Sequence, residues 1–255
     1  MHNVLPAIRS ALFALCQILI TPPYAFVALL TFPLPPLARY HIIAGWARFF
    51  VWLASALCGL RYRVVGLENI PKQPCVFLAK HQSAWETLAF QAILPPHVMV
   101  IKRELLWIPF FGWGLAMMSP IAINRAAGMR SLKQIQEQGK SRLALGFGVA
   151  IYPEGTRTAP GRTTKYQTGG AWLAIKAGVP VIPIAHNAGY LWSRNSFVKH
   201  PGIVTVSIGP PVLTEGRKPD AVTGETAAWI EAEVARIGNP AKRQGRRTKH
   251  TQHGT

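Results

Sequence analysis

From Leu60 onward the sequence alternates between short β-rich runs and longer stretches with helical periodicity. The β-rich runs are Tyr62–Val65, Val76–Ala79, Val98–Ile101, Pro120–Ile123, Val149–Tyr152, Val181–Ile184 and Val204–Ile208, and the helical stretches are Trp85–Ile93, Met129–Leu145, Ala171–Ala177 and Ala221–Ile237. Strands that alternate with helices predict parallel strands joined by crossover helices. We therefore expect an α/β domain with a largely parallel mixed sheet flanked by helices.

The segment that precedes this domain has no charged residue between Arg9 and Arg39. Such a run is long enough to cross a membrane, for which about 20 apolar residues suffice. Proline inside a helix removes a hydrogen bond and clashes with the previous turn, so Pro22-Pro23 interrupts the run and Pro33–Pro36 ends it. We expect two short membrane-associated helices that dip into one face of the bilayer, with a single kinked span as the alternative.

The next segment, Ile42–Leu60, is rich in aromatic residues and carries Arg48 as its only charge. This composition suits either the headgroup layer of a membrane or a core helix, and the sequence leaves both open. The chain thus divides into a hydrophobic helical segment (1–60), the α/β domain (61–238) and a basic tail (239–255). The tail lacks core-forming residues, which predicts disorder.

The charge of the chain is strongly unbalanced. Its 28 Lys and Arg face 10 Asp and Glu, which gives a formal net charge of +18. This excess predicts an anionic partner, either nucleic acid, an anionic membrane surface or a phosphorylated substrate, and the apolar N-terminus favours the membrane over nucleic acid. The three cysteines show no metal-ligand spacing and favour a reducing, cytoplasmic-facing location.

His81 follows the apolar run Cys75–Ala79 and stands five residues before Glu86. Ser83-Ala84-Trp85-Glu86 matches the capping-box pattern, so we expect His81 in a loop and Glu86 in the first turn of a helix. A carboxylate on Nδ1 would leave Nε2 free to accept a proton at neutral pH. The alternative is that Glu86 only caps its own helix. Ser83 is interpreted as an N-cap and not as a nucleophile.

Two arginines stand just after the carboxyl ends of predicted strands. Arg125 ends the run that starts at Ser119, and Arg157 ends the turn that starts at Glu154. Guanidinium groups at the carboxyl ends of neighbouring strands can hold a phosphate through bidentate hydrogen bonds. Either arginine alone would be interpreted as a solvated surface charge.

In order along the chain, these blocks resemble the motifs of the glycerolipid acyltransferase family, and in particular those of the 1-acylglycerol-3-phosphate acyltransferases. The first motif, His-x4-Asp, is matched by His81 to Glu86 with Glu in place of Asp; the second ends in Arg after a strand, as in Ile121–Arg125; the third, Phe-Pro-Glu-Gly-Thr-Arg, is matched by Tyr152–Arg157; the fourth, a Val-Pro-Val/Ile strand, is matched by Val181–Ile184. The resemblance covers roughly residues 62 to 210.

The resemblance implies transfer of a fatty acyl group from a thioester to the sn-2 hydroxyl of lysophosphatidate. His81 is then the general base and Glu86 its orienting acid, while Arg125 and the turn Glu154-Gly155-Thr156-Arg157 bind substrate. In this scheme the arginines hold the phosphate, Glu154 positions the glycerol or supports Arg157, and amides near Gly155 serve as oxyanion donors. No cofactor or metal is implied.

The implied partners are lysophosphatidate, an acyl thioester and anionic membrane lipid, with acyl-CoA or acyl carrier protein as the donor. The implied location is the cytoplasmic face of a bacterial inner membrane. Two alternatives remain. The first is an acyltransferase for glycerol 3-phosphate or another lysolipid, and the second is a non-enzymatic basic protein that binds membranes or nucleic acid.

Overall fold

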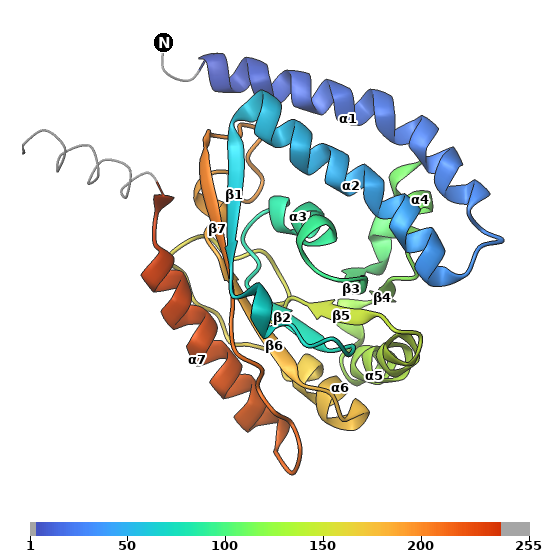
Figure 1. The fold of residues 1–255 in the computed structure, drawn as a ribbon, viewed down its shortest axis with the longest axis vertical. Helices are drawn as coiled ribbons and strands as arrows, with labels where there is room; N and C mark the ends of the chain where they lie inside the picture. Colours follow the sequence, from blue (N-terminus) through green and yellow to red (C-terminus); the bar gives the residue numbers. More distant parts are fainter. Residues whose placement is uncertain (1–3, 241–255) are drawn as a thin grey trace, which may run out of the picture.

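The computed structural model describes residues 4–240. Two helices, α1 (Val4–Leu30) and α2 (Pro36–Cys58), lead into an α/β domain (Figure 1). The domain runs β1 (Leu60–Val65), β2 (Val76–Ala79), α3 (Trp85–Ile93), β3 (His97–Lys102), α4 (Phe111–Met117), β4 (Ile121–Ile123), α5 (Met129–Ala144), β5 (Gly148–Ile151), α6 (Gly169–Ala177), β6 (Val181–His186), β7 (Gly202–Ile208) and α7 (Pro219–Ile237).

The seven described strands form one sheet in the order β1-β7-β6-β2-β5-β3-β4. All neighbouring strands in it are parallel except β6 and β7, which pair antiparallel. The central strands β2, β5 and β6 are buried along their whole length, as expected for parallel strands covered on both faces. The prediction of a largely parallel mixed sheet is confirmed.

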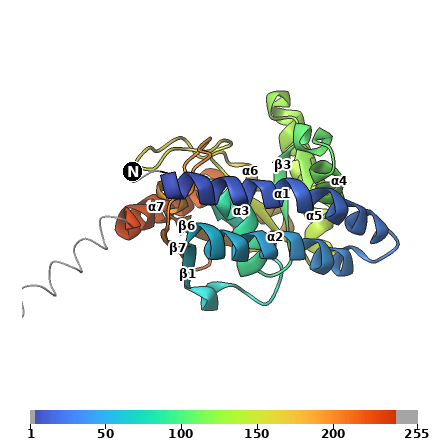
Figure 2. The same cartoon turned by 90° about the horizontal axis from the view of Figure 1, so that it is seen from above.

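Alternate residues of the strands face two hydrophobic layers. On one face, Phe77 and Ala79 of β2 belong to a core built with α2 and α3. On the other face, Val76 and Leu78 pack with α5 and α6, and α7 contacts α6 and β6. Helices α1 and α2 run side by side, and α1 lies on the outside of the pair (Figure 2).

The expected break of the first helix at Pro22-Pro23 is wrong, because α1 continues through both prolines to Leu30. Contacts with α2 stabilise the helix close to the lost hydrogen bonds. The Trp46 indole donates to Thr21 Oγ1 (3.3 Å), and the Tyr24 hydroxyl donates to the Ile42 carbonyl (2.6 Å). Tertiary contacts thus outweigh the local cost of proline, and one continuous helix, Val4–Leu30, stands where two short helices were expected.

Helix α2 packs into the core of the domain on one side and is exposed on the other, so the core-helix role is confirmed and the headgroup role stays a prediction. Phe50, Leu53 and Cys58 are buried in the core of the domain, whereas Trp52 is 61% exposed. By length and composition, both α1 and α2 are apolar enough to cross a membrane. Large apolar side chains also cover the outer surface of α1, where Ile18 and Leu30 are 69% and 80% exposed. These helices therefore present an apolar surface of the kind that suits association with a membrane.

The sequence did not predict α4. This helix contains two glycines, which lower helix propensity, and it begins after Phe110, whose φ of 62° is unusual for a residue with a side chain. Its place is fixed by packing of Phe110 and Trp113 on Phe26 of α1. Apart from its first two residues, the basic tail (239–255) lies outside the described residues, so its predicted disorder stays a prediction.

Candidate active site

His81 and Glu86 meet at the carboxyl end of β2. His81 lies in the loop between β2 and α3, and Glu86 lies in the first turn of α3. The distance from His81 Nδ1 to Glu86 Oε1 is 2.9 Å. The same carboxylate oxygen accepts hydrogen bonds from the backbone amides of Gln82 (2.9 Å) and Ser83 (2.8 Å). One oxygen therefore caps the helix and contacts the imidazole, so the two roles expected for Glu86 coexist.

The environment of Glu86 favours its charged form. Burial alone would raise the pKa of this carboxyl, but His186, His81 and the Ser83 amide outweigh it and hold the pKa below its ordinary value. Since a carboxylate only accepts hydrogen bonds, His81 Nδ1 carries a proton and its Nε2 is the nitrogen that can accept another. The N-cap of α3 is Ala84 and not Ser83 as predicted, but the Ser83 hydroxyl, one residue earlier, accepts from the Trp85 amide at the start of the helix (3.1 Å).

Tyr152 fixes the other side of the imidazole. It follows β5, and its ring stacks on the His81 ring with centroids 4.1 Å apart and an interplanar angle of 20°. Phe90 of α3 lies nearly parallel to Tyr152 at a centroid distance of 6.3 Å. The carbonyl of His81 accepts from the Thr158 amide (2.7 Å). The loop that carries His81 is thus held by α3, β5 and the turn after β5.

Arg125 and Arg157 line the same cavity as His81. Burial lowers the pKa of Arg125, Glu104 opposes this effect, and the nearby charge of Arg157 adds to it. The guanidinium of Arg125 donates to the carbonyl of Gly155, and Arg194 Nη1 donates to the carbonyl of Arg157 (2.8 Å). The two predicted arginines are therefore brought together beside the imidazole.

The turn that carries Arg157 places its other residues differently from the expectation. Glu154 does not line the cavity. Its Oε1 accepts from the His81 amide (2.9 Å) and lies 3.4 Å from the Lys80 ammonium. The Gly155 amide already donates to the Tyr152 carbonyl (3.0 Å), so this amide is not available as an oxyanion donor. Thr156 is exposed on the turn.

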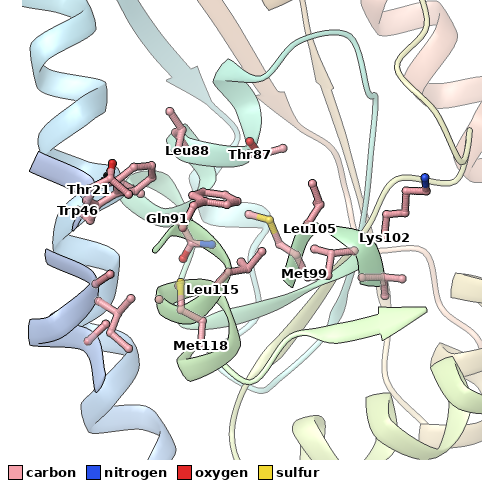
Figure 3. A pocket seen from close by; sticks show the side chains of 18 of the residues that line it. Thr21, Trp46, Thr87, Leu88, Gln91, Met99, Lys102, Leu105, Leu115 and Met118 are labelled. Carbon is pink, nitrogen blue, oxygen red and sulfur yellow. Dashed lines mark hydrogen bonds between the residues drawn. The ribbon is translucent and has the colours of Figure 1, made fainter. Parts of the chain in front are cut away.

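Three further residues of this region were not singled out from the sequence as site residues. Lys102, at the end of β3, lines the cavity as a third cation (Figure 3). Lys80 is 1% exposed and pairs with Glu231 of α7 at 2.7 Å. His186, at the end of β6, donates from Nε2 to the Lys80 carbonyl (2.7 Å). The general rule that sites form at the carboxyl ends of parallel strands is the only sequence signal that could have found them.

The cavity has a volume of about 220 Å³. Apolar side chains such as Leu88, Met99 and Leu115 make up much of its lining (Figure 3). Its apolar lining comes from α1, α2, α3, β3 and α4, and includes Ala28, Trp46, Leu88, Met99, Gly114 and Leu115. Pockets of this kind, apolar with a few convergent polar groups, are typical of small-molecule sites. The cavity therefore combines the His81 imidazole, which can accept a proton, with three cationic side chains and an apolar space that can hold a hydrocarbon chain.

Comparison with known proteins identifies similar chains. The acyltransferase family model matches residues 61–187. The 1-acyl-sn-glycerol-3-phosphate acyltransferase of Pseudomonas aeruginosa is 43% identical over 240 residues, which cover 92% of this chain and 93% of that protein. The enzyme of the same name from Saccharomyces cerevisiae is 30% identical over 208 residues, which cover 78% of this chain and 67% of that protein.

A solved structure shares the fold. The crystal structure of the 1-acyl-sn-glycerophosphate (LPA) acyltransferase from Thermotoga maritima matches with a TM-score of 0.76 and 22% sequence identity, and the match covers 92% of this chain and 96% of that one. Because a relative is 43% identical over 92% of this chain, and the acyltransferase family model matches residues 61–187, this chain belongs to the acyltransferase family.

Proposed function

We propose that this protein transfers a fatty acyl group from an acyl thioester to the sn-2 hydroxyl of 1-acylglycerol 3-phosphate, which yields phosphatidate. One observation carries the proposal: a single cavity is lined by the His81 imidazole, by Arg125 and Arg157, and by apolar side chains of four helices. The Pseudomonas aeruginosa and Saccharomyces cerevisiae relatives bear the name of this activity.

In this mechanism His81 Nε2 takes the proton of the acceptor hydroxyl as the oxygen attacks the thioester carbonyl. The negative charge of Glu86 stabilises the imidazolium that forms, and its oxygen holds the ring in the Nδ1–H tautomer. Collapse of the tetrahedral intermediate expels the thiolate, which receives the proton from His81. General base catalysis of this kind contributes about 10²–10⁴-fold to the rate.

The cations that line the cavity are assigned to the acceptor phosphate. Arg125 and Arg157 supply planar guanidinium groups that match a phosphate, and Lys102 adds a third positive charge to the lining. Arg125 is in addition tied to the Gly155 carbonyl, so it also fixes the turn that carries Arg157. Glu154 acts from behind this turn, through Lys80 and the His81 amide, and is assigned a positioning role.

The apolar part of the cavity is assigned to an acyl chain. Its walls include α1 and α2, the two helices with apolar outer surfaces, so the site for the acyl chain lies next to the part of the protein that we assign to the bilayer. We place the protein on the cytoplasmic face of the inner membrane, where its excess of positive charge attracts anionic lipid. The donor is either acyl-CoA or acyl carrier protein.

The test uses the full chain in membranes supplied with lysophosphatidate and acyl-CoA, and measures phosphatidate formation for the wild type and for His81→Ala. The proposal expects loss of at least two orders of magnitude in the variant. Equal rates would rule out the base. The runner-up acceptor is glycerol 3-phosphate, and a kcat/KM for it above that for lysophosphatidate would replace the proposed acceptor.

A further inference from the structure

Helix α1 lies between the cavity and the outer apolar surface of the protein. Ala25 and Ala28 are buried and line the cavity, whereas their neighbours Phe26 and Val27 are 54% and 44% exposed. The cavity and the outer surface are therefore one helix apart at this point, and α1 is apolar enough to lie in a bilayer.

Helix α4 continues this wall beside the C-terminal half of α1 (Figure 1). Its Gly114 and Leu115 line the cavity, while Trp113 is 39% exposed. The Trp113 ring lies 6.2 Å from the Phe26 ring, so the outer apolar surface extends from α1 onto α4. Further in, a Cβ on Gly114 would lie 3.8 Å from the Cβ of Ala28. The α1–α4 seam, which we define by these two contacts, thus connects the outer surface with the cavity.

The α1–α4 seam is held by apolar contacts alone. Within residues 4–240 no hydrogen bond or ion pair joins α1 to α4, whereas Thr21 and Tyr24 bind α1 to α2 through hydrogen bonds. Between helices in a bilayer, apolar contacts have little hydrophobic driving force, because lipid tails are as apolar as the side chains. Opening of the seam therefore costs less in a bilayer than in water, since an acyl chain can replace the lost contacts.

Both ends of α4 carry a residue with an unusual backbone conformation. Phe110 has φ 62° and ψ −57°, and the Phe111 amide donates to the Pro109 carbonyl (2.7 Å), which is the rare, strained form of the γ-turn. Ser119 has φ 56°, and its carbonyl accepts from Arg142 Nε (2.9 Å). Strained residues of this kind concentrate at ligand clamps and switch regions. Phe110 and Ser119 are thus suited to be hinges, because a change of φ at either end relieves strain while α5 holds Ser119.

We propose that α4 swings away from α1 and that the acyl chain of a single-chain phospholipid enters the cavity sideways from the bilayer through the opened α1–α4 seam. The charged headgroup does not follow this path, because its transfer into an apolar environment is costly. It moves along the surface of the bilayer to Arg125 and Arg157 while the chain passes between the two helices. The inference rests on the proposed acyl transfer and gives the route by which the acceptor reaches the site.

A disulfide across the seam tests this route. Ala28→Cys combined with Gly114→Cys places two Cβ atoms 3.8 Å apart, which is the usual separation in a disulfide. Phosphatidate formation from acyl-CoA and long-chain lysophosphatidate is measured with the full chain in vesicles, after diamide and again after dithiothreitol, and mass spectrometry identifies the linked peptides. We expect the oxidised double variant to lose about tenfold in rate and to recover on reduction, because a locked α4 cannot admit the chain.

The two single variants are the matched controls. Each is compared with itself before and after diamide, which reports any oxidation of the native Cys16, Cys58 and Cys75. Without a partner thiol across the seam, the rate of each should change by less than about twofold, since α4 stays free to move. An equal loss in a single variant would assign the effect to other thiols and overturn the inference.

A short-chain, water-soluble lysophosphatidate separates entry of the chain from the chemistry. It needs no sideways passage, so the oxidised double variant should keep its activity on this acceptor within about twofold. Equal losses on both acceptors would overturn the inference, as would full activity of the oxidised protein on the long-chain acceptor. Failure of the two thiols to link would contradict the closed seam itself.

His81→Ala, assayed in parallel, separates this inference from the proposed function. Full activity in His81→Ala would sink the acyl-transfer mechanism. Loss of activity in His81→Ala together with an unaffected disulfide-linked variant would sink only the route through the α1–α4 seam.

Discussion

Replacement of Glu86 by Gln separates the charge of this residue from its geometry. The amide oxygen of Gln can accept the same hydrogen bonds from the Gln82 and Ser83 amides and from His81 Nδ1 that Glu86 Oε1 accepts now. Because two backbone donors point at this oxygen, the Gln side chain is oriented with its oxygen toward the imidazole. The tautomer of His81 is therefore kept, and only the negative charge is lost.

The size of the effect follows from Coulomb's law. His81 Nδ1 lies 2.9 Å from the carboxylate oxygen, and Glu86 is fully buried. Charges about 4 Å apart at an effective dielectric constant of about 20 interact by about 4 kcal/mol. The retained hydrogen bond offsets part of this loss, so we expect kcat to fall about 10²-fold. In catalytic triads where an amide imposes the wrong tautomer, the loss is about 10⁴-fold.

The assay is acyl transfer to lysophosphatidate with the full chain in membranes, and Glu137→Gln, on the exposed side of α5, serves as the charge-matched control. Glu86→Asp keeps the charge but shortens the side chain by one methylene, so it should retain more activity than Glu86→Gln. Wild-type activity in Glu86→Gln would show that the carboxylate is only a helix cap. Activity of Gln above that of Asp would mean that position matters more than charge, which contradicts the argument.

Arg157→Ala should raise the KM for lysophosphatidate at least tenfold and leave the KM for acyl-CoA unchanged; an equal rise with an acceptor that lacks phosphate would refute the phosphate role. Glu231→Gln leaves the buried Lys80 ammonium with only the carboxylate of Glu154, so denaturant unfolding in detergent should show a loss of about 2 kcal/mol, and no loss would mean that the pair is not stabilising. Burial lowers the pKa of His97 to about 4, so this residue contributes stability above the unfolded value near 6.5 that is lost as the pH falls through 4. The loss is about 3 kcal/mol and should be absent in His97→Gln, whereas equal pH profiles of unfolding would contradict it. Gly114→Leu should shift kcat/KM toward shorter acyl donors, because the new side chain enters the cavity; an unchanged preference would place the acyl chain elsewhere.

Most strands and helices could be predicted from the sequence, because the way each element is buried determines its pattern of apolar residues. β2, β5 and β6 are buried on both faces and are therefore continuous apolar runs, and α5 shows helical periodicity because one side of it is exposed. α1 was misread because the rule that proline breaks a helix is local, whereas contacts from α2 on both sides of Pro22-Pro23 are tertiary. A local signal predicts an element only where no distant contact overrides it.

The candidate site likewise has residues that the sequence identified and contacts that it could not reveal. His81, Glu86, Arg125 and Arg157 could be identified because each closes or follows a strand, and parallel strands bring their carboxyl ends to one edge. The contacts of Glu154 were hidden, because the His81 amide that donates to it is 73 residues away along the chain and only the pairing of β2 with β5 brings the two together. The substrate role expected for Glu154 stays a prediction.

The replacement of the usual Asp by Glu at position 86 has a physical consequence that the motif alone does not convey. With Glu, one oxygen reaches His81 Nδ1 and also two backbone amides of the loop that precedes α3. The same oxygen therefore binds the loop before α3 and orients the imidazole. A shift of α3 along its axis would move this oxygen, the loop and the imidazole together. His81 is thus positioned by the helix start, and mutations in the α2–α3 contact that tilt α3 should lower kcat without touching the cavity.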